Sequence, residues 1–197
     1  MQTDLSTCFP LRPARMHEAS GPGAAAFAAI AAAMSQGNLL WVREGWRPER
    51  INPVGLSGFF DPSRLLLAEP SSQSDCLSVT EEALRDGSLS LVVAEVNQDI
   101  GLTAGRRLQL AAKAGNTTGL CLIPEGMGSN AAETRWHCAP VFDSAAASGD
   151  STLQRWEIIK NKTGTLGIWH VRWDRAAHRL HVVPPAGKRP GSSRTPG

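Results

Sequence analysis

The sequence predicts an α/β protein: a core of mostly parallel sheet flanked by helices, with an antiparallel C-terminal extension of the sheet. Three observations predict it. Helical patterns alternate with short apolar segments up to residue 123. Residues 89–96 (LSLVVAEV) are continuously apolar, as expected for a central parallel strand that is covered on both faces. The remainder of the chain contains strand-like segments without helical periodicity.

The elements follow in order. A turn at residues 20–23 precedes the first helix. Gly87 is expected to end the second helix and Gly115 the third. Ser78 or an earlier serine is expected to cap the start of the second helix, and Thr103 the start of the third. Helices are expected over residues 24–35, 74–85 and 103–114, and strands over residues 38–43, 64–68, 89–96, 118–123, 135–141, 155–161, 167–174 and 179–183. Residues 143–152 (DSAAASGDST) predict a mobile loop.

The length fits one domain with flexible ends. The chain has 197 residues and 42% apolar residues, enough to bury a core without a metal or a disulfide framework. We expect an irregular N-terminal arm over residues 1–16, the domain over residues 17–184 and a disordered basic tail over residues 185–197. The cysteines have no CxxC spacing and predict buried, reduced thiols in a reducing compartment, hence a cytoplasmic protein; they are Cys8, Cys76, Cys121 and Cys138.

Charge limits the function classes. The formal net charge is +2, and the tail carries Lys188, Arg189 and Arg194, so the body is about neutral. A strongly basic domain, whose bulk charge alone would indicate nucleic-acid binding, is excluded, although a local basic patch remains possible.

Residues 19–42 contain no charged side chain, but they are mostly alanine, which contributes little apolar area. They predict a buried, close-packed helix and not a signal peptide or membrane span.

Residues 21–28 (GPGAAAFA) have the layout of a phosphate-binding loop, in which Gly-Pro and small residues follow a strand and open a helix. RecA-type recombinases carry GPESSGKT in this place. Gly21 and Pro22 remain, but the resemblance places Ala26 at the second loop glycine, Phe27 at the phosphate-binding lysine and Ala28 at the magnesium-binding hydroxyl. Without that cation and hydroxyl, phosphates and their metal lose their main partners. We expect no ATP hydrolysis, no cofactor and no metal.

Other segments resemble the same family. Residues 91–96 (LVVAEV) stand where RecA-like proteins have the strand that ends in a metal-organising Asp, and residues 126–136 replace the second DNA-binding loop. Residues 156–162 (WEIIKNK) are similar to the RecA segment whose lysines reach a nucleotide across the filament interface. The chain resembles the ImuA family more closely. ImuA proteins are RecA-like proteins of the bacterial SOS mutagenesis cassette. The similar segments are FFDPSRLLL, TEEALRDGSLSLVVAEV, LTAGRRLQLAAKAG, ETRWHCAP and RWEIIKNKTGTLGIWHVRWD.

The ImuA resemblance implies a RecA-like domain with a non-enzymatic, accessory role in error-prone translesion DNA synthesis. It implies as partners an ImuB-like, polymerase-related protein and an error-prone polymerase subunit, with DNA contacted directly or through them. Two alternatives remain open from the sequence: a DNA-binding module, and a weak ATP-binding switch. The short arm argues against RecA-type self-polymerisation, and self-association stays open.

Basic residues supply the interface candidates. Lys160 and Lys162 alternate along one strand face; because two like charges disfavour burial, we expect this face to meet solvent or an anionic partner. Arg106 and Arg107 either contact a partner or DNA or mark a solvated helix face. Trp46, followed by arginines, is a candidate anchor in a protein interface.

Two further sets have alternative interpretations. Glu95, at the end of a central strand, is either a relic of metal or water positioning or an ion-paired or capping carboxylate. The tryptophans Trp136, Trp156, Trp169 and Trp173 either fill the core or form a stacking platform for single-stranded DNA.

The histidines lack metal-ligand spacing. A GxSxG elbow is absent, and GLSG at residues 55–58 is expected in a loop, so no catalytic residue is assigned.

Overall fold

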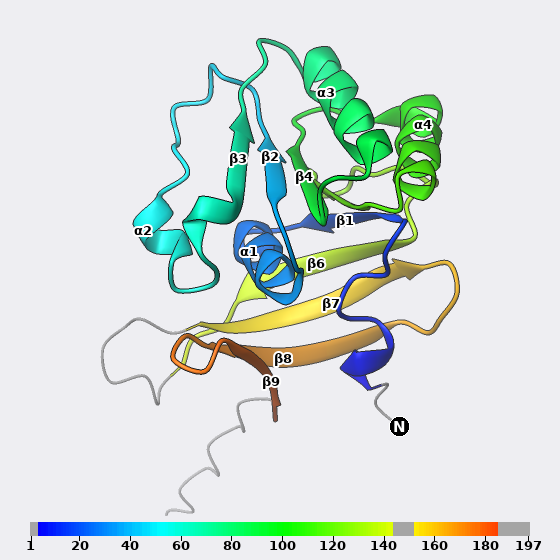
Figure 1. Ribbon diagram of the computed structural model, residues 1–197. Helices are drawn as coiled ribbons and strands as arrows, with labels where there is room; N and C mark the ends of the chain where they lie inside the picture. Colours follow the sequence, from blue (N-terminus) through cyan, green and yellow to red (C-terminus); the bar gives the residue numbers. More distant parts are fainter. Residues whose placement is uncertain (1–3, 144–151, 185–197) are drawn as a thin grey trace, which may run out of the picture.

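The computed structural model describes residues 4–143 and 152–184 and has the α/β architecture that the sequence predicts. Its strands form a nine-stranded sheet in the order β3-β2-β4-β5-β1-β6-β7-β8-β9 (Figure 1). From β3 to β6 the neighbours in this order are parallel, and from β6 to β9 they are antiparallel. The strands are β1 (Met16–Ser20), β2 (Leu39–Val42), β3 (Leu65–Ala68), β4 (Leu91–Glu95), β5 (Thr118–Leu122), β6 (Thr134–Pro140), β7 (Leu153–Asn161), β8 (Gly167–Asp174) and β9 (Arg179–Val183).

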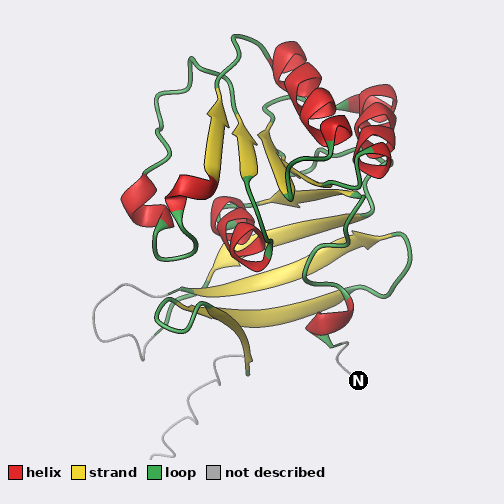
Figure 2. Cartoon of the chain, in the orientation of Figure 1, coloured by secondary structure: helices red, strands yellow, loops and turns green. Residues whose placement is uncertain are grey.

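Helices cover both faces of the parallel part of the sheet. They are α1 (Ala24–Met34), α2 (Pro53–Leu56), α3 (Gln73–Asp86) and α4 (Gly101–Ala114), with short 3-10 turns at Leu5–Thr7 and Pro62–Arg64. Figure 2 shows α1 on one side of the sheet and α3 with α4 on the other. Each side has its own apolar core. Seven of the eleven residues of α1 are buried, which confirms the expectation of a buried alanine-rich helix.

The cap of α3 is Ser72, whose side chain accepts a hydrogen bond from the Asp75 amide. Ser72 is one of the earlier serines that the sequence left open, and Ser78 lies inside the helix. Two local expectations were wrong. Thr103 also lies inside its helix, because α4 begins at Gly101. The GLSG segment does not lie wholly in a loop, since its first two residues end α2, a short helix that Asn52 caps.

The N-terminal arm belongs to the main core. Its described part, residues 4–15, is irregular apart from the turn at Leu5–Thr7. Leu5, Phe9 and Leu11 are nevertheless buried in the core on the α1 side. The predicted tail over residues 185–197 and most of the predicted mobile loop, residues 144–151, lie outside the described residues.

The four cysteines are free thiols. Cys76, Cys121 and Cys138 are buried, as predicted, whereas Cys8 is only partly buried. In the described residues, no helix has the length and apolar character needed to cross a membrane.

Candidate functional site

A groove of about 870 Å3 lies at the carboxyl ends of the parallel strands. Its walls include the turn after β1, at Gly21, and the ends of β2, β4 and β5, at Arg43, Glu95 and Leu122. The first turns of α1 line another side. Because parallel α/β sheets bind ligands at this edge, the groove is the candidate functional site.

The turn between β1 and α1 is held against β6. Gly21 has φ +88°, and the amide of Gly23 donates a hydrogen bond of 2.8 Å to the carbonyl of Cys138. A Cβ on Gly21 would lie 2.5 Å from that same carbonyl oxygen. Glycine is therefore required at the first position of the loop by both backbone conformation and close approach.

Phe27, which the resemblance places at the position of a phosphate-binding lysine, points into the core. Phe27 is fully buried, and its ring centroid lies 4.7 Å from that of Trp156, 5.2 Å from Trp136 and 5.6 Å from Phe9. Ala26 lines the groove, and Ala28 is buried. The loop thus offers the groove neither a cation nor a hydroxyl group.

Glu95 is an ion-paired carboxylate. The indole Nε1 of Trp41 donates a hydrogen bond of 2.7 Å to its Oε1, and Arg47 pairs with its Oε2. Within residues 4–143 and 152–184, no group of three or more His, Cys, Asp or Glu side chains could hold a metal ion. The ion-paired interpretation is confirmed, and the carboxylate is already engaged by protein donors.

Arg43 is the feature of this groove that the sequence reasoning missed. Its side chain is only 3% exposed, and its Nε has no hydrogen-bond partner among the described residues. The carboxylate of Glu49 lies 3.9 Å away, beyond hydrogen-bond distance. One signal in the sequence could have identified Arg43: it is a charged residue directly after the apolar strand β2. A buried, incompletely paired guanidinium gives the groove the capacity to accept an anionic group.

Lys162 is exposed and Lys160 is half-buried, and the ammonium groups of both are engaged by backbone carbonyls. The Nζ of Lys162 donates to the carbonyl of Ala131 at 2.6 Å, and the Nζ of Lys160 donates to the carbonyls of Asn130, at 3.3 Å, and Ala132. These carbonyls lie in a loop outside any helix or strand and need donors, so the lysines hold the loop before β6.

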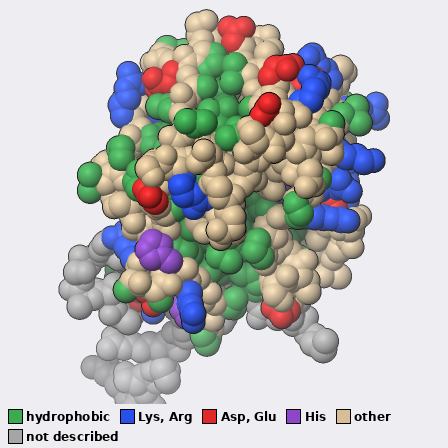
Figure 3. All heavy atoms as spheres, viewed as in Figure 1, with side chains coloured by type: hydrophobic (Ala, Val, Ile, Leu, Met, Phe, Trp, Pro, Cys, Tyr) green, Lys and Arg blue, Asp and Glu red, His purple; other side chains and the backbone are tan. Residues whose placement is uncertain are grey.

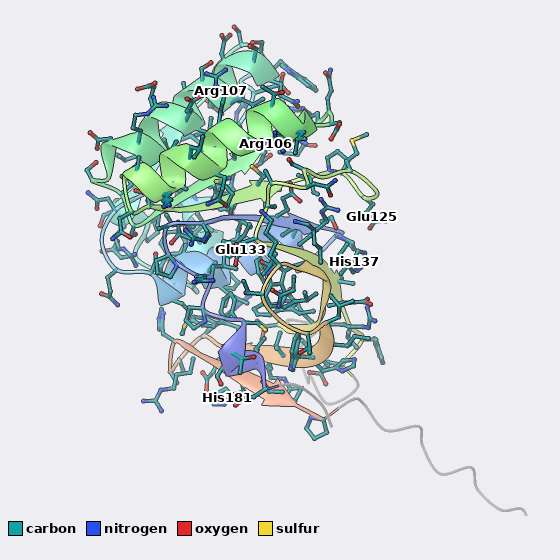
Figure 4. The ribbon with its side chains drawn as sticks, turned by 90° about the vertical axis from the view of Figure 1, so that its right-hand side faces the viewer. Arg106, Arg107, Glu125, Glu133, His137 and His181 are labelled. Atoms are coloured by element: carbon teal, nitrogen blue, oxygen red, sulfur yellow. The ribbon has the colours of Figure 1, made fainter. Side chains whose placement is uncertain are left out.

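Arg106 and Arg107 point to different neighbours (Figure 4). Arg107 pairs with Glu81 of α3 at 2.6 Å, whereas Arg106 lines a groove beside α4 together with Lys162. Trp46 is 65% exposed and follows β2, at the edge where the larger groove lies. The structure therefore brings Arg106 and Lys162 together and leaves Trp46 apart.

The tryptophans are core residues. Trp136, Trp156 and Trp169 are fully buried, and Trp173 is 2% exposed with its indole Nε1 bonded to the carbonyl of Gly58 at 2.8 Å. The stacking-platform interpretation was wrong, because no indole face of this set is open to a base.

Fold and site together define a class: an α/β protein with a parallel core, an antiparallel extension and a glycine turn at the carboxyl edge of the strands that opens an apolar helix. The chain is similar to two curated proteins called Protein ImuA, from the Caulobacter vibrioides strains NA1000/CB15N and ATCC 19089/CB 15. Identity to each is 29% over 210 residues, which cover 91% of this chain and 84% of the relative. No protein-family model matches the chain.

Proposed function

We propose that this chain is a non-catalytic accessory protein of an ImuA/ImuB-type system for tolerating DNA damage. In this proposal it acts in the cytoplasm as a scaffold that recruits an ImuB-like protein and a specialised, error-prone polymerase. The name of the two Caulobacter relatives supports the pathway, since the similarity extends over 91% of the chain.

The buried Phe27 carries the non-catalytic part of the proposal. Phosphoryl transfer depends on positioning and on cations that neutralise the phosphates. Here the side chain at the lysine position packs 4.7 Å from Trp156, centroid to centroid. Recovering a lysine at this place would put an ammonium group into an apolar core. An interaction role needs none of this chemistry.

Co-purification of the chain with an ImuB-like protein and its polymerase, without nucleotide, tests the scaffold. We expect a stable complex whose yield is unchanged by ATP and magnesium. Absence of a complex, together with salt-sensitive binding of single-stranded DNA by the chain alone, would favour the DNA-binding alternative instead.

A second candidate function is a ligand-binding switch, and Arg43 is the observation that favours it. Its unpartnered Nε and its place in the wall of the 870 Å3 groove suit a nucleotide or another anion. A bound ligand raises the melting temperature by mass action. Thermal unfolding of the wild type and of Arg43→Gln, with and without saturating ATP and magnesium, distinguishes the nucleotide switch from the scaffold. A wild-type melting temperature that ATP leaves unchanged removes the nucleotide switch.

A further inference from the structure

A second groove, of about 520 Å3, lies between α4 and the loop that precedes β6. Leu102, Arg106 and Leu110 line it from α4, Ala131 lines it from the loop, and Lys162, directly after β7, completes the wall. We call it the α4 groove. It is separate from the groove at the carboxyl ends of the strands, with which it shares no lining residue.

The α4 side of this groove presents two exposed leucines, one turn to either side of an exposed arginine. Leu102, Arg106 and Leu110 are spaced by four residues, so they lie on one face of the helix. Leu102 is 46% exposed and Leu110 is 66% exposed. The opposite face of α4 is already used, since Leu108 and Ala111 pack into the core against the sheet. The helix therefore has a second, partly apolar face that the described fold does not cover.

The surroundings of the α4 groove are positively charged. Arg12 and Arg15 both pair with Glu133, at 3.2 and 3.7 Å, and Arg135 pairs with Glu18 at 2.7 Å. The carboxylates are thus already neutralised. The cations beside this loop are Arg12, Arg15, Arg106, Arg135, Lys160 and Lys162. Figure 3 shows Lys and Arg side chains gathered on the side of the molecule where α4 lies.

The pKa of Lys160 is lowered, in part by this surplus of positive charge. Burial lowers its pKa, and repulsion from the neighbouring Lys162 lowers it further. The described residues that line the α4 groove include no carboxylate. An incoming acidic group would relieve the repulsion and pair with Arg106, whose side chain is exposed.

We propose that the α4 groove is the docking site for an acidic, amphipathic helix of a partner protein. Apolar side chains of that helix cover Leu102 and Leu110, and its carboxylates pair with Arg106 and Lys162, in the manner of a helix laid in a groove. This inference rests on the proposed function of the chain as an interaction module and assigns the surface. Protein suits the groove better than nucleic acid, because phosphates do not cover leucines and no aromatic side chain among the described lining residues offers a base a stacking face.

Binding to the purified ImuB-like partner, measured by calorimetry or by surface-immobilised titration, tests the assignment. The groove variants are Leu102→Ser/Leu110→Ser and Arg106→Glu; all three side chains are exposed, so these variants are expected to fold. Matched controls are Val54→Ser, 80% exposed on α2, and Arg179→Glu, an exposed arginine on β9. Each chain is also titrated with a single-stranded oligonucleotide, and the wild type is measured at low and high salt.

We expect both groove variants to raise the Kd for the partner about tenfold or more, the controls to leave it unchanged, and salt to weaken the wild-type complex. Wild-type affinity in the groove variants would overturn the docking site and leave the proposed function standing. No complex with the wild type would overturn both. Loss of oligonucleotide binding in Arg106→Glu, with partner binding unchanged in Leu102→Ser/Leu110→Ser, would overturn the protein partner in favour of nucleic acid.

Discussion

Single side chains determine what the loop at the ligand edge can do. Phe27 occupies the position at which the resemblance places a phosphate-binding lysine, yet its ring lies among Phe9, Trp136 and Trp156. In this structure Phe27 is a packing residue. Its contribution is therefore expected in the free energy of unfolding.

Replacing Phe27 by Ala should lower the free energy of unfolding by about 3 to 5 kcal/mol, because a fully buried ring leaves a cavity. Urea unfolding followed by tryptophan fluorescence measures it. Val54→Ala, at an exposed position, is the control and should change stability by about 0.5 kcal/mol or less. A loss below about 1 kcal/mol for Phe27→Ala would contradict the packing role.

His17 is a buried histidine of the same central region. Its Nε2 lies 3.0 Å from the carbonyl of Arg12 and its Nδ1 lies 2.7 Å from Thr134 Oγ1, which in turn accepts a hydrogen bond from Trp136 Nε1. This network suits a neutral imidazole that donates through Nε2. Burial lowers the pKa of His17 to about 4, although Glu133 favours the charged form.

Stability should therefore fall as the pH falls. The unfolded chain binds a proton at His17 near the ordinary pKa of 6.5 and the folded chain only near 4, so the contribution is complete above pH 6.5 and is lost between pH 6.5 and pH 4. The difference corresponds to about 3 kcal/mol. Urea unfolding at several pH values should show that the stability gap between the wild type and His17→Gln narrows over this window. His181→Gln, at an exposed site, should parallel the wild type; a gap independent of pH would refute the assignment.

At the scale of elements, the joint between β1 and α1 depends on contact with β6. Gly21 lies in the left-handed region, and a Cβ there would meet the carbonyl of Cys138. Gly126 also has a positive φ, +77°, but nothing lies within 4 Å of its Cβ position. Substitution of Gly126 therefore tests backbone strain alone, whereas substitution of Gly21 tests strain together with a close contact to β6.

Gly21→Ala should be more destabilising than Gly126→Ala. Both substitutions carry a backbone strain of about 1 to 3 kcal/mol, but only the first forces the turn away from β6. We expect Gly21→Ala to lower the unfolding free energy by at least about 1 kcal/mol more, measured by chemical denaturation of both variants. Equal losses would show that the turn can move away from β6 without cost.

At the scale of the whole molecule, the arm, α1 and the antiparallel extension share one core. Phe9 packs against Phe27, 5.6 Å between centroids, and against Trp156, 5.0 Å. These contacts join the start of the chain to β7. A two-state transition is therefore expected to include the arm.

Phe9→Ala should destabilise the entire domain by about 3 to 5 kcal/mol and not merely detach the arm. Far-UV circular dichroism and tryptophan fluorescence should report one coincident transition at lower denaturant. Ser6→Ala, in the same arm and exposed, should unfold as the wild type does. Unchanged global stability with a protease-sensitive arm would contradict a shared core.

The sequence by itself determined the fold class, because apolar periodicity is a local property of the chain. It located most helices and strands to within a few residues, as well as the buried character of α1, but it set no bounds for β1 and did not predict α2. That Ala26, Phe27 and Ala28 stand in place of phosphate-binding side chains stays a prediction. Composition and spacing likewise sufficed for the free thiols.

Only the tertiary structure decided where side chains point and what they meet. Lys160 and Lys162 alternate on a strand, yet they bind the carbonyls of a loop about thirty residues earlier in the chain. Arg43 became notable through burial, and Leu102, Arg106 and Leu110 because no element of the described part of the chain covers them. Such properties depend on contacts between distant segments, and periodicity within one segment carries no information about them.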